Sequence, residues 1–281
     1  MSLVTLATAA AATLLVGTDA PTVQATIDHA QSGDIVVVPA GTWYGAVVVD
    51  KAITLRGQGV VDGGDEGTVL TVTAAGARVQ GLKIRGSGSD LAAPDACVYI
   101  AAEAIGAIVR DSELWDCTFG IWVHQARQVQ IEGNRVRGRT DLGHRSNRGN
   151  GIHLFDSSGL RVVDNTIVGG RDGIYVSATE DSLIEGNIVQ DLRYGIHYMY
   201  SWRNTVRANR AERNTAGIAL MASQHLLVEG NIARDNDVHG ILFRDIQYTT
   251  IQGNEVTGNG EGLFFFSSLD NTLQNNLIAH N

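Results

Sequence analysis

Two methionines and a histidine stand where their side chains could bind a soft metal ion. Residues 193–201 read RYGIHYMYS, so His197 and Met199 lie two positions apart among aromatic residues that favour strands. Met221 follows 22 residues after Met199, and the chain has only 3 methionines, one of them the initiator. Thioether sulfur and imidazole nitrogen together suit copper, particularly Cu(I). The alternative is an apolar contact patch, because methionine is common at adaptable interfaces.

A repeat of about 22 residues sets the direction in which these side chains point. A glycine followed by Ile or Leu recurs in steps of 22, 22, 22, 23 and 22 residues, at Gly151, Gly173, Gly195, Gly217, Gly240 and Gly262. An asparagine follows 14 residues after each glycine, at Asn165, Asn187, Asn209, Asn231, Asn254 and Asn276. Short strings of strand-forming residues lie between the two columns, and the period is too short for a helical solenoid. The sequence therefore predicts an all-β fold, a single-stranded parallel β-helix in which one repeat is one coil.

The same repeat predicts the core of the β-helix. Coils stack about 4.8 Å apart, and alternate side chains of a strand point to opposite faces. The residue after each glycine points inward and forms one aliphatic column, at Ile152, Ile174, Ile196, Ile218, Ile241 and Leu263. A second inward column holds Val162, Ile184, Val206, Val228, Ile251 and Leu273. We expect the asparagines to turn inward at one corner and to hydrogen-bond along the axis, over about ten to eleven coils in all.

The two ends of the chain differ in character. The string PTVQATIDHA places its apolar residues on one helix face, which predicts a short helix over residues 22–30 that caps the open end of the bore. Residues 1–19, rich in alanine, fit either the remnant of a secretion signal or the first strand. Because the chain stops at Asn281 inside a repeat, we expect residues 1–281 to be one domain of a longer, C-terminally truncated protein.

One interval is longer than the repeat. From Gly120 to Gly151 the chain runs 31 residues, and the excess lies in RVRGRTDLGHRSNRGN, residues 135–150. Insertions in solenoids leave the coil on one face and often bind a partner. The alternative is a solvated loop without a partner. Of the arginines in this segment, we expect three to contact a partner: Arg137, Arg139 and Arg145.

Strand alternation also predicts a stripe of outward side chains. The positions two and four residues after each glycine point outward. The first of these positions holds Trp122, His153, Tyr175 and His197, and the second holds Phe155, Met199 and Met221. Water-exposed faces seldom carry so many aromatic residues, so we expect a partner, a ligand or another segment to cover the stripe. Trp122, Tyr175 and Phe155 are candidates for partner binding. We expect a shallow, exposed copper site formed by His197, Met199 and Met221, with His153 as a further candidate ligand.

Composition excludes some classes of function. The net charge is −9 and the pI about 5.3, so a nucleic-acid-binding face is not expected, because phosphate contacts need clustered cations. No apolar run approaches the length of a membrane span. The chain has 2 cysteines, Cys97 and Cys117, which occupy different columns of the repeat. We therefore do not expect a disulfide between them.

Several strings resemble one known family. GSGSDLAAPDA, RGNGIHL, GGRDGIY, RYGIHYMYS and EGLFFFSSLDNTL occur here in the order typical of the NosD family, periplasmic β-helix proteins needed for maturation of nitrous oxide reductase. The resemblance runs from about Thr22 to the end of the chain and implies a right-handed β-helix and a non-enzymatic role. It also implies work in the periplasm with an ABC transporter, a copper chaperone and the reductase, in supplying copper, or copper and sulfur, to the metal centres of the reductase.

Two other functions compete with this expectation. Many parallel β-helices are polysaccharide lyases, hydrolases or epimerases, which need paired carboxylates or a base beside a cation. The acidic candidates here scatter over different columns: Asp156, Asp172, Asp181, Asp245 and Asp270. The second competitor is a docking adaptor that binds partners but no metal. Copper affinity distinguishes this adaptor from a copper-supplying protein, and cleavage of an acidic polysaccharide would identify an enzyme.

Overall fold

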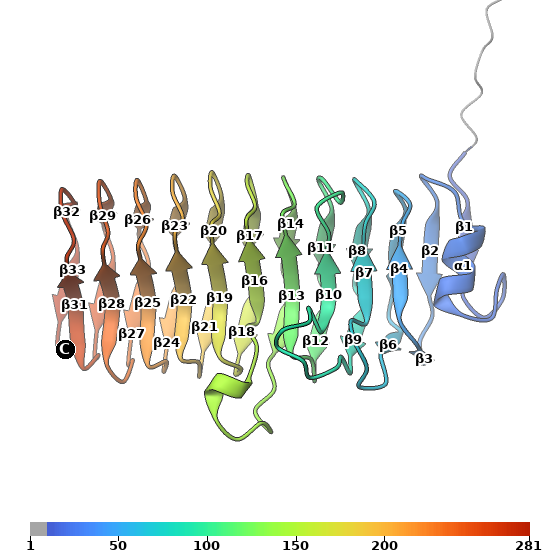
Figure 1. The fold of residues 1–281 in the computed structure, drawn as a ribbon, viewed down its shortest axis with the longest axis horizontal. Helices are drawn as coiled ribbons and strands as arrows, with labels where there is room; N and C mark the ends of the chain where they lie inside the picture. Colours follow the sequence, from blue (N-terminus) through green and yellow to red (C-terminus); the bar gives the residue numbers. More distant parts are fainter. Residues whose placement is uncertain (1–9) are drawn as a thin grey trace, which may run out of the picture.

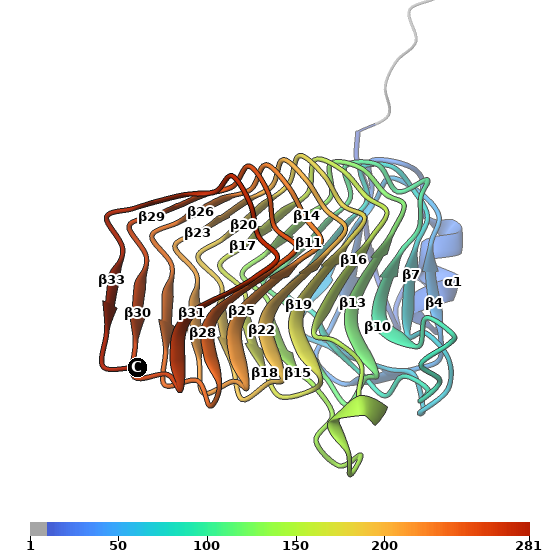
Figure 2. The same ribbon diagram turned by 60° about the vertical axis from the view of Figure 1, so that its left-hand side comes forward.

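The computed structural model describes residues 10–281, which form a parallel β-helix with the strands of successive coils stacked side by side (Figure 1). Three sheets of 12, 10 and 11 strands run along its axis. The prediction of a single-stranded parallel β-helix is confirmed, and the longest sheet gives about twelve turns instead of ten to eleven. Figure 2 shows the coils obliquely along the axis, with one long loop leaving them on one side.

Each complete coil contributes one strand to each sheet. The first sheet contains β1 (Thr13–Leu15), β2 (Ile35–Val38), β5 (Thr54–Gly57), β8 (Arg78–Gln80), β11 (Ile108–Arg110), β14 (Gln130–Glu132), β17 (Arg161–Val163), β20 (Leu183–Glu185), β23 (Thr205–Arg207), β26 (Leu227–Glu229), β29 (Thr250–Gln252) and β32 (Thr272–Gln274). The second sheet contains β4 (Val47–Val49), β7 (Leu70–Val72), β10 (Ala96–Ile100), β13 (Phe119–His124), β16 (Ile152–Phe155), β19 (Asp172–Ser177), β22 (Tyr194–Met199), β25 (Ala216–Met221), β28 (His239–Arg244) and β31 (Glu261–Phe266). The third sheet contains β3 (Thr42–Tyr44), β6 (Val60–Asp62), β9 (Lys83–Arg85), β12 (Glu113–Trp115), β15 (Arg135–Arg137), β18 (Thr166–Val168), β21 (Ile188–Gln190), β24 (Arg210–Glu212), β27 (Ile232–Arg234), β30 (Glu255–Thr257) and β33 (Leu277–Ala279).

The bore is filled by the aliphatic columns that the repeat predicts. Ile174 pairs in register with Ile152 before it and Ile196 after it, and all three side chains are fully buried. The glycine column has a steric cause. A Cβ atom on Gly173 would lie 2.4 Å from the carbonyl oxygen of Gly195 in the next coil, so a larger residue would push the coils apart.

The predicted asparagine ladder is confirmed at the corner between the first and third sheets. Nδ2 of Asn165 donates to Oδ1 of Asn187 at 3.0 Å, and Nδ2 of Asn187 donates to Oδ1 of Asn209 at 2.9 Å. The pattern continues to Asn276. A second ladder, which we did not predict, stacks along the corner between the third and second sheets. Its members are Asn214, Asn236, Asn259 and Asn281.

The start of the coil is covered by a helix, as predicted. Helix α1 (Val23–His29) begins at Thr22, whose hydroxyl oxygen accepts a hydrogen bond from the amide of Ala25 at 3.1 Å. Its apolar face buries Val23 and Ile27 against the first coils. Strand β1 precedes it and pairs with β2, so the first-strand alternative holds for residues 13–15, and residues 1–9 lie outside the described part. Within residues 10–281, no helix has the length and apolarity needed to cross a membrane.

The inserted segment leaves the coil later than predicted. Residues 135–137 form β15 of the third sheet, and the loop proper begins at Gly138. It contains a short 3₁₀ helix, η1 (Arg145–Asn147), and protrudes from the corner between the third and second sheets (Figures 1 and 2). The guanidinium of Arg148 donates to carbonyl oxygens of Leu142, Thr140 and Gly143. The loop is therefore organised by its own arginine.

The two cysteines form a disulfide, which corrects our expectation. Sγ atoms of Cys97 and Cys117 are bonded, and their Cα atoms lie 5.5 Å apart. The column argument failed because it assumed straight stacking of strands. Cys97 lies in β10, whereas Cys117 lies in the corner that leads from β12 to β13, where the chain bends back toward the second sheet. Both residues are buried, so the bond fastens two adjacent coils from inside.

Candidate functional site

The outer face of the second sheet carries the predicted metal ligands. His197 lies in the middle of β22, between Tyr175 on β19 and Ala219 on β25 in register. Met199 ends β22 and pairs directly with Met221, which ends β25, and both side chains are half-buried. The fold therefore brings the two methionines and His197 onto one face of two adjacent coils.

The expected exposure of this site was wrong. The His197 side chain faces outward from the bore, yet the residue is only 7% exposed. The residues that precede the column glycines, such as Asp172 and Tyr194, rise beside the stripe and cover it. Strand alternation predicts which face a side chain occupies, but it does not predict how neighbouring columns cover that face. The site is enclosed, with the methionines at its more open edge.

A buried carboxylate holds the imidazole of His197. Oδ2 of Asp172 lies 3.0 Å from Nδ1 of His197, and Asp172 is fully buried. Arg193 donates from Nε to Oδ1 at 2.8 Å and from Nη2 to Oδ2 at 2.6 Å. Nε of Arg171 lies farther away, 3.8 Å from Oδ2. The opposite nitrogen of the ring, Nε2 of His197, is buried and has no hydrogen-bond partner among residues 10–281.

The charge of Asp172 follows from these contacts. Burial alone raises the pKa of a carboxyl group, because it penalises the ionised form. Hydrogen bonds from His197 and Arg193 outweigh this effect and hold the pKa of Asp172 below its usual value. Asp172 is therefore an ionised carboxylate at neutral pH. An ionised carboxylate can only accept hydrogen bonds.

His153 lies two rungs from His197, with Tyr175 between them in register. Its ring stacks on Trp122 at 4.4 Å and 4°, and it meets the edge of the Tyr175 ring at 4.9 Å. Nδ1 of His153 lies 3.3 Å from Nδ2 of Asn150. Burial lowers the pKa of His153 to about 3, and the charge of Arg171 adds to the effect. The structure does not bring His153 to the methionines.

The residues proposed for partner contact differ in exposure. Phe155 is 39% exposed, whereas Trp122 and Tyr175 are half-buried within the aromatic stack. The indole nitrogen of Trp122 is buried and has no hydrogen-bond partner among residues 10–281. Of these three side chains, Phe155 is therefore the most accessible to another protein.

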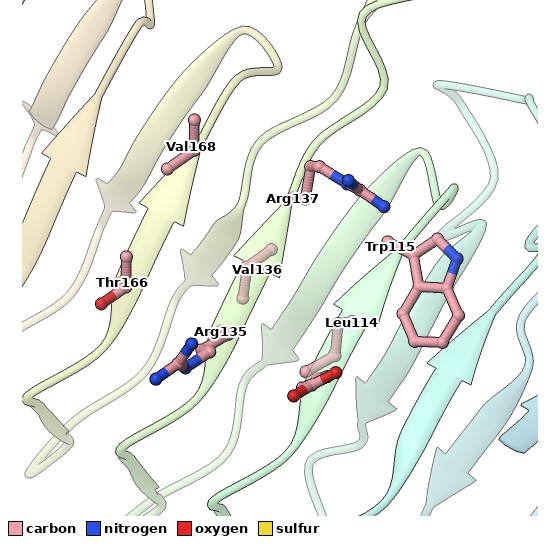
Figure 3. A pocket seen from close by; sticks show the side chains of 8 residues that line it. Leu114, Trp115, Arg135, Val136, Arg137, Thr166 and Val168 are labelled. Carbon is pink, nitrogen blue, oxygen red and sulfur yellow. The ribbon is translucent and has the colours of Figure 1, made fainter.

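The three arginines proposed for partner contact do not form one patch. Arg137 is exposed on β15, where it lies beside Trp115 of β12 at the edge of a shallow groove (Figure 3). Arg139 pairs with Asp141 inside the loop at 2.7 Å. Arg145 turns back to the coil instead and donates from Nη1 to the carbonyl oxygen of Leu192 at 3.2 Å. Sequence spacing placed them together, but the corner separates them.

Among the acidic residues considered for polysaccharide chemistry, four have different partners, namely Asp156, Asp172, Asp181 and Asp245. Asp181 pairs with Arg203 at 2.8 Å on the far side of the coil, and Asp245 lies 3.7 Å from Arg244. Of the five acidic residues considered, Asp172 is the one that lies beside a histidine on the second sheet. Sequence reasoning counted Asp172 as one scattered acid and overlooked Arg193. The available signal was the position of Asp172 directly before a column glycine, on the coil preceding His197.

No group of three or more histidine, cysteine, aspartate or glutamate side chains is placed to hold a metal ion within the described residues. A site made of His197 and methionine sulfur would not belong to this class of groups, because methionine is not among these residue types. Thioether and imidazole ligands suit Cu(I) better than oxygen-preferring cations. The donor set and the unpartnered Nε2 atom thus fit a soft metal ion.

Comparison with protein families gives two matches. Residues 139–281 match the family described as periplasmic copper-binding protein (NosD), and residues 26–187 match the right-handed β-helix region. Two relatives are both called probable ABC transporter binding protein NosD. The one from Stutzerimonas stutzeri is 37% identical over 257 residues, which cover 85% of this chain and 58% of the relative. The one from Pseudomonas aeruginosa is 35% identical over 256 residues, which cover 85% and 60%. The chain thus spans less than two thirds of either relative.

Solved structures with the same fold include enzymes. The A-module of the Azotobacter vinelandii mannuronan C-5 epimerase AlgE4 superposes with a TM-score of 0.64 at 18% identity, over 90% of this chain and 72% of that module. An alginate lyase from Paenibacillus superposes with a TM-score of 0.68 at 14% identity, over 92% and 99%. At such low identity these likenesses establish the right-handed parallel β-helix and nothing about activity.

Proposed function

Because the chain belongs to the NosD family, we propose that it is a non-enzymatic accessory protein for maturation of nitrous oxide reductase. Its cargo in this proposal is Cu(I), carried by His197, Met199 and Met221 on the outer face of the second sheet. His153 is omitted from the ligand set, because Tyr175 stands between it and His197.

One observation carries the proposal. Nε2 of His197 is buried and has no partner in the described part of the chain, residues 10–281, while Nδ1 of the same ring is held by Asp172. Buried polar atoms are nearly always paired, so an unpaired one calls for a ligand. On the same face of the sheet, Met199 follows two residues after His197 on β22 and pairs in register with Met221 on β25, so both sulfur ligands belong to the same two coils. A site with few ligands, and with the half-buried methionines at its more open edge, suits an ion that must be handed on.

The place of action in this proposal is the periplasm, where an ABC transporter, a copper chaperone and the reductase would be its partners. The Cys97–Cys117 disulfide supports an oxidising compartment, because such bonds are rare in the cytosol. Partner contacts are proposed at Arg137, Arg139 and Arg145 and at Trp122, Tyr175 and Phe155. Phe155 offers the simplest probe, because it is the most exposed of the aromatic set.

Anaerobic titration with Cu(I) against a competing chelator tests the metal assignment. We expect the variants Met199→Ala/Met221→Ala and His197→Ala to keep the β-sheet circular dichroism spectrum and to lose at least about tenfold in Cu(I) affinity. Arg244→Ala is the matched control, because Arg244 occupies the next rung of the methionine column. If the double methionine variant binds Cu(I) as tightly as the parent, the face is a metal-free docking surface and the proposal is wrong.

A further inference from the structure

We propose that Asp172 is a positioning residue that holds His197 in the one tautomer able to present Nε2 to a metal ion. The inference rests on the proposed function, since it takes His197 as a ligand. It adds two residues, Asp172 and Arg193, that touch no metal themselves. Asp172 lies 25 residues before His197, on the preceding coil.

Asp172 and Arg193 determine which nitrogen of the His197 ring carries the proton. Arg193 grips both oxygens of Asp172, from Nε at 2.8 Å and from Nη2 at 2.6 Å. This fork geometry is typical of a guanidinium with an ionised carboxylate, which has no hydrogen to donate. The atom 3.0 Å away, Nδ1 of His197, must therefore be the donor. In the neutral form of the ring, which has one N–H group, Nε2 then carries the free lone pair.

Two tyrosine rings hold the orientation of the His197 ring. The His197 ring meets Tyr175 at 5.0 Å and 62° on one side and Tyr194 at 4.8 Å and 74° on the other. The guanidinium of Arg193 lies 4.6 Å above the Tyr194 ring. The residue that binds Asp172 therefore also packs on one of the two rings that flank His197. Turning the ring over about its Cβ–Cγ bond would break the bond to Asp172 and would put the carbon Cε1 at the position of Nε2.

This arrangement prepares His197 to bind a metal ion. Histidine ligands generally donate the other ring N–H to a carboxylate or carbonyl, which orients the ring and raises its basicity. Here that outer partner is already in place, and the metal-facing atom is buried and unpartnered among residues 10–281. What the ring still lacks among residues 10–281 is a partner for Nε2. Asp172 and Arg193 thus prepare the site before any ion arrives.

The chain contains a matched pair for comparison. His239 and Glu261 also bring a histidine Nδ1 and a carboxylate oxygen together, at 3.1 Å on the second sheet, although Nδ1 of His239 makes no hydrogen bond among residues 10–281. Glu261 is exposed, and no methionine lies on its strand. The substitution Glu261→Gln therefore makes the same chemical change as Asp172→Asn at a place where no metal ligand depends on it.

The test uses the full chain labelled with ¹⁵N, at neutral pH and without metal. Long-range ¹H–¹⁵N spectra report the tautomer of each histidine, and the signals absent from His197→Ala identify His197. We expect the parent to show a protonated Nδ1 and an unprotonated Nε2. We expect Asp172→Asn to lose this preference and about tenfold or more in Cu(I) affinity, and Glu261→Gln to change neither.

The outcomes separate this inference from the proposed function. A parent with Nε2 protonated overturns the inference even if Asp172→Asn fails to fold, because that measurement needs no variant at position 172. Unchanged Cu(I) affinity in Asp172→Asn also overturns it, while leaving the proposed function standing. A parent that binds no Cu(I) overturns both.

Discussion

Nη1 of Arg145, in the inserted loop, donates a hydrogen bond to Oγ1 of Thr215 at 2.9 Å, although the two residues are 70 positions apart in the chain. The same atom reaches the carbonyl oxygen of Leu192. These bonds fasten the loop to two later coils, one that contains Leu192 and one that contains Thr215. Leu192 directly precedes Arg193, the partner of Asp172. The loop is therefore attached beside the candidate metal site instead of extending freely into solvent.

Replacing Arg145 with serine should loosen this loop without unfolding the coil. We expect cleavage by subtilisin between residues 138 and 150 to become several-fold faster, because the bonds to Leu192 and Thr215 are lost. The urea midpoint of the whole chain should stay nearly constant. Arg137→Ser is the control, because Arg137 points outward from β15 and holds no part of the loop. Equal cleavage rates in the two variants would show that Arg145 does not anchor the loop.

The stability of the protein should fall when the pH drops below 6.5, because of His153. Burial lowers the pKa of His153 from 6.5 to about 3, so below pH 6.5 the unfolded chain binds a proton that the folded chain refuses. The free energy of unfolding should therefore decrease by about 1.4 kcal/mol per pH unit from this residue, from pH 6.5 down toward 3.

Urea unfolding at several pH values between 7.5 and 4.5 measures this effect. His153→Phe keeps an aromatic ring against Trp122. It should reduce the slope of the free energy of unfolding against pH by the amount that corresponds to about one bound proton. His29→Phe replaces an exposed histidine and serves as the control for loss of an imidazole elsewhere in the chain. The same pH dependence in His153→Phe as in the parent would assign the slope to other groups.

The asparagine ladder should contribute more to stability than any exposed asparagine. Asn187 accepts from the amide of Asn165 at 2.9 Å and donates to the carbonyl oxygen of Val162 at 2.9 Å, all within the buried corner. Asn187→Ala leaves both backbone groups without a partner, at about 1–3 kcal/mol each. We expect a loss of about 3 kcal/mol or more in the free energy of unfolding. Asn147→Ala, in the exposed loop, should cost no more than about 0.5 kcal/mol, and equal losses would contradict this assignment.

Reduction of the disulfide should destabilise the coil. Cys97 and Cys117 are 20 residues apart, and closing a loop of this size stabilises a protein by about 3 kcal/mol in the chain-entropy model. The urea midpoint should fall with a reductant, and to a similar extent in Cys97→Ala/Cys117→Ala. The reductant should have no effect on that double variant. A parent whose midpoint is unchanged, although thiol titration shows complete reduction, would contradict the prediction.

The sequence by itself determined the coil and its interior. A two-column repeat was enough to predict the parallel β-helix, the buried column around Ile174 and the ladder through Asn187. Helix α1 was also predictable, because its apolar spacing is local. These features follow from period and alternation alone, since each coil repeats the backbone path of the one before and stacks in register upon it.

Only the tertiary structure decided what happens at the corners and over the outer face. The repeat placed Cys97 and Cys117 in different columns, yet the bend before β13 joins them. It placed Met199 and His197 on one face, but it could not show that Asp172 and Arg193 close over that face. The physical reason is that register fixes Cα positions, whereas side chains at corners lean across columns. Their partners depend on length, charge and packing between coils, which a one-dimensional period does not contain.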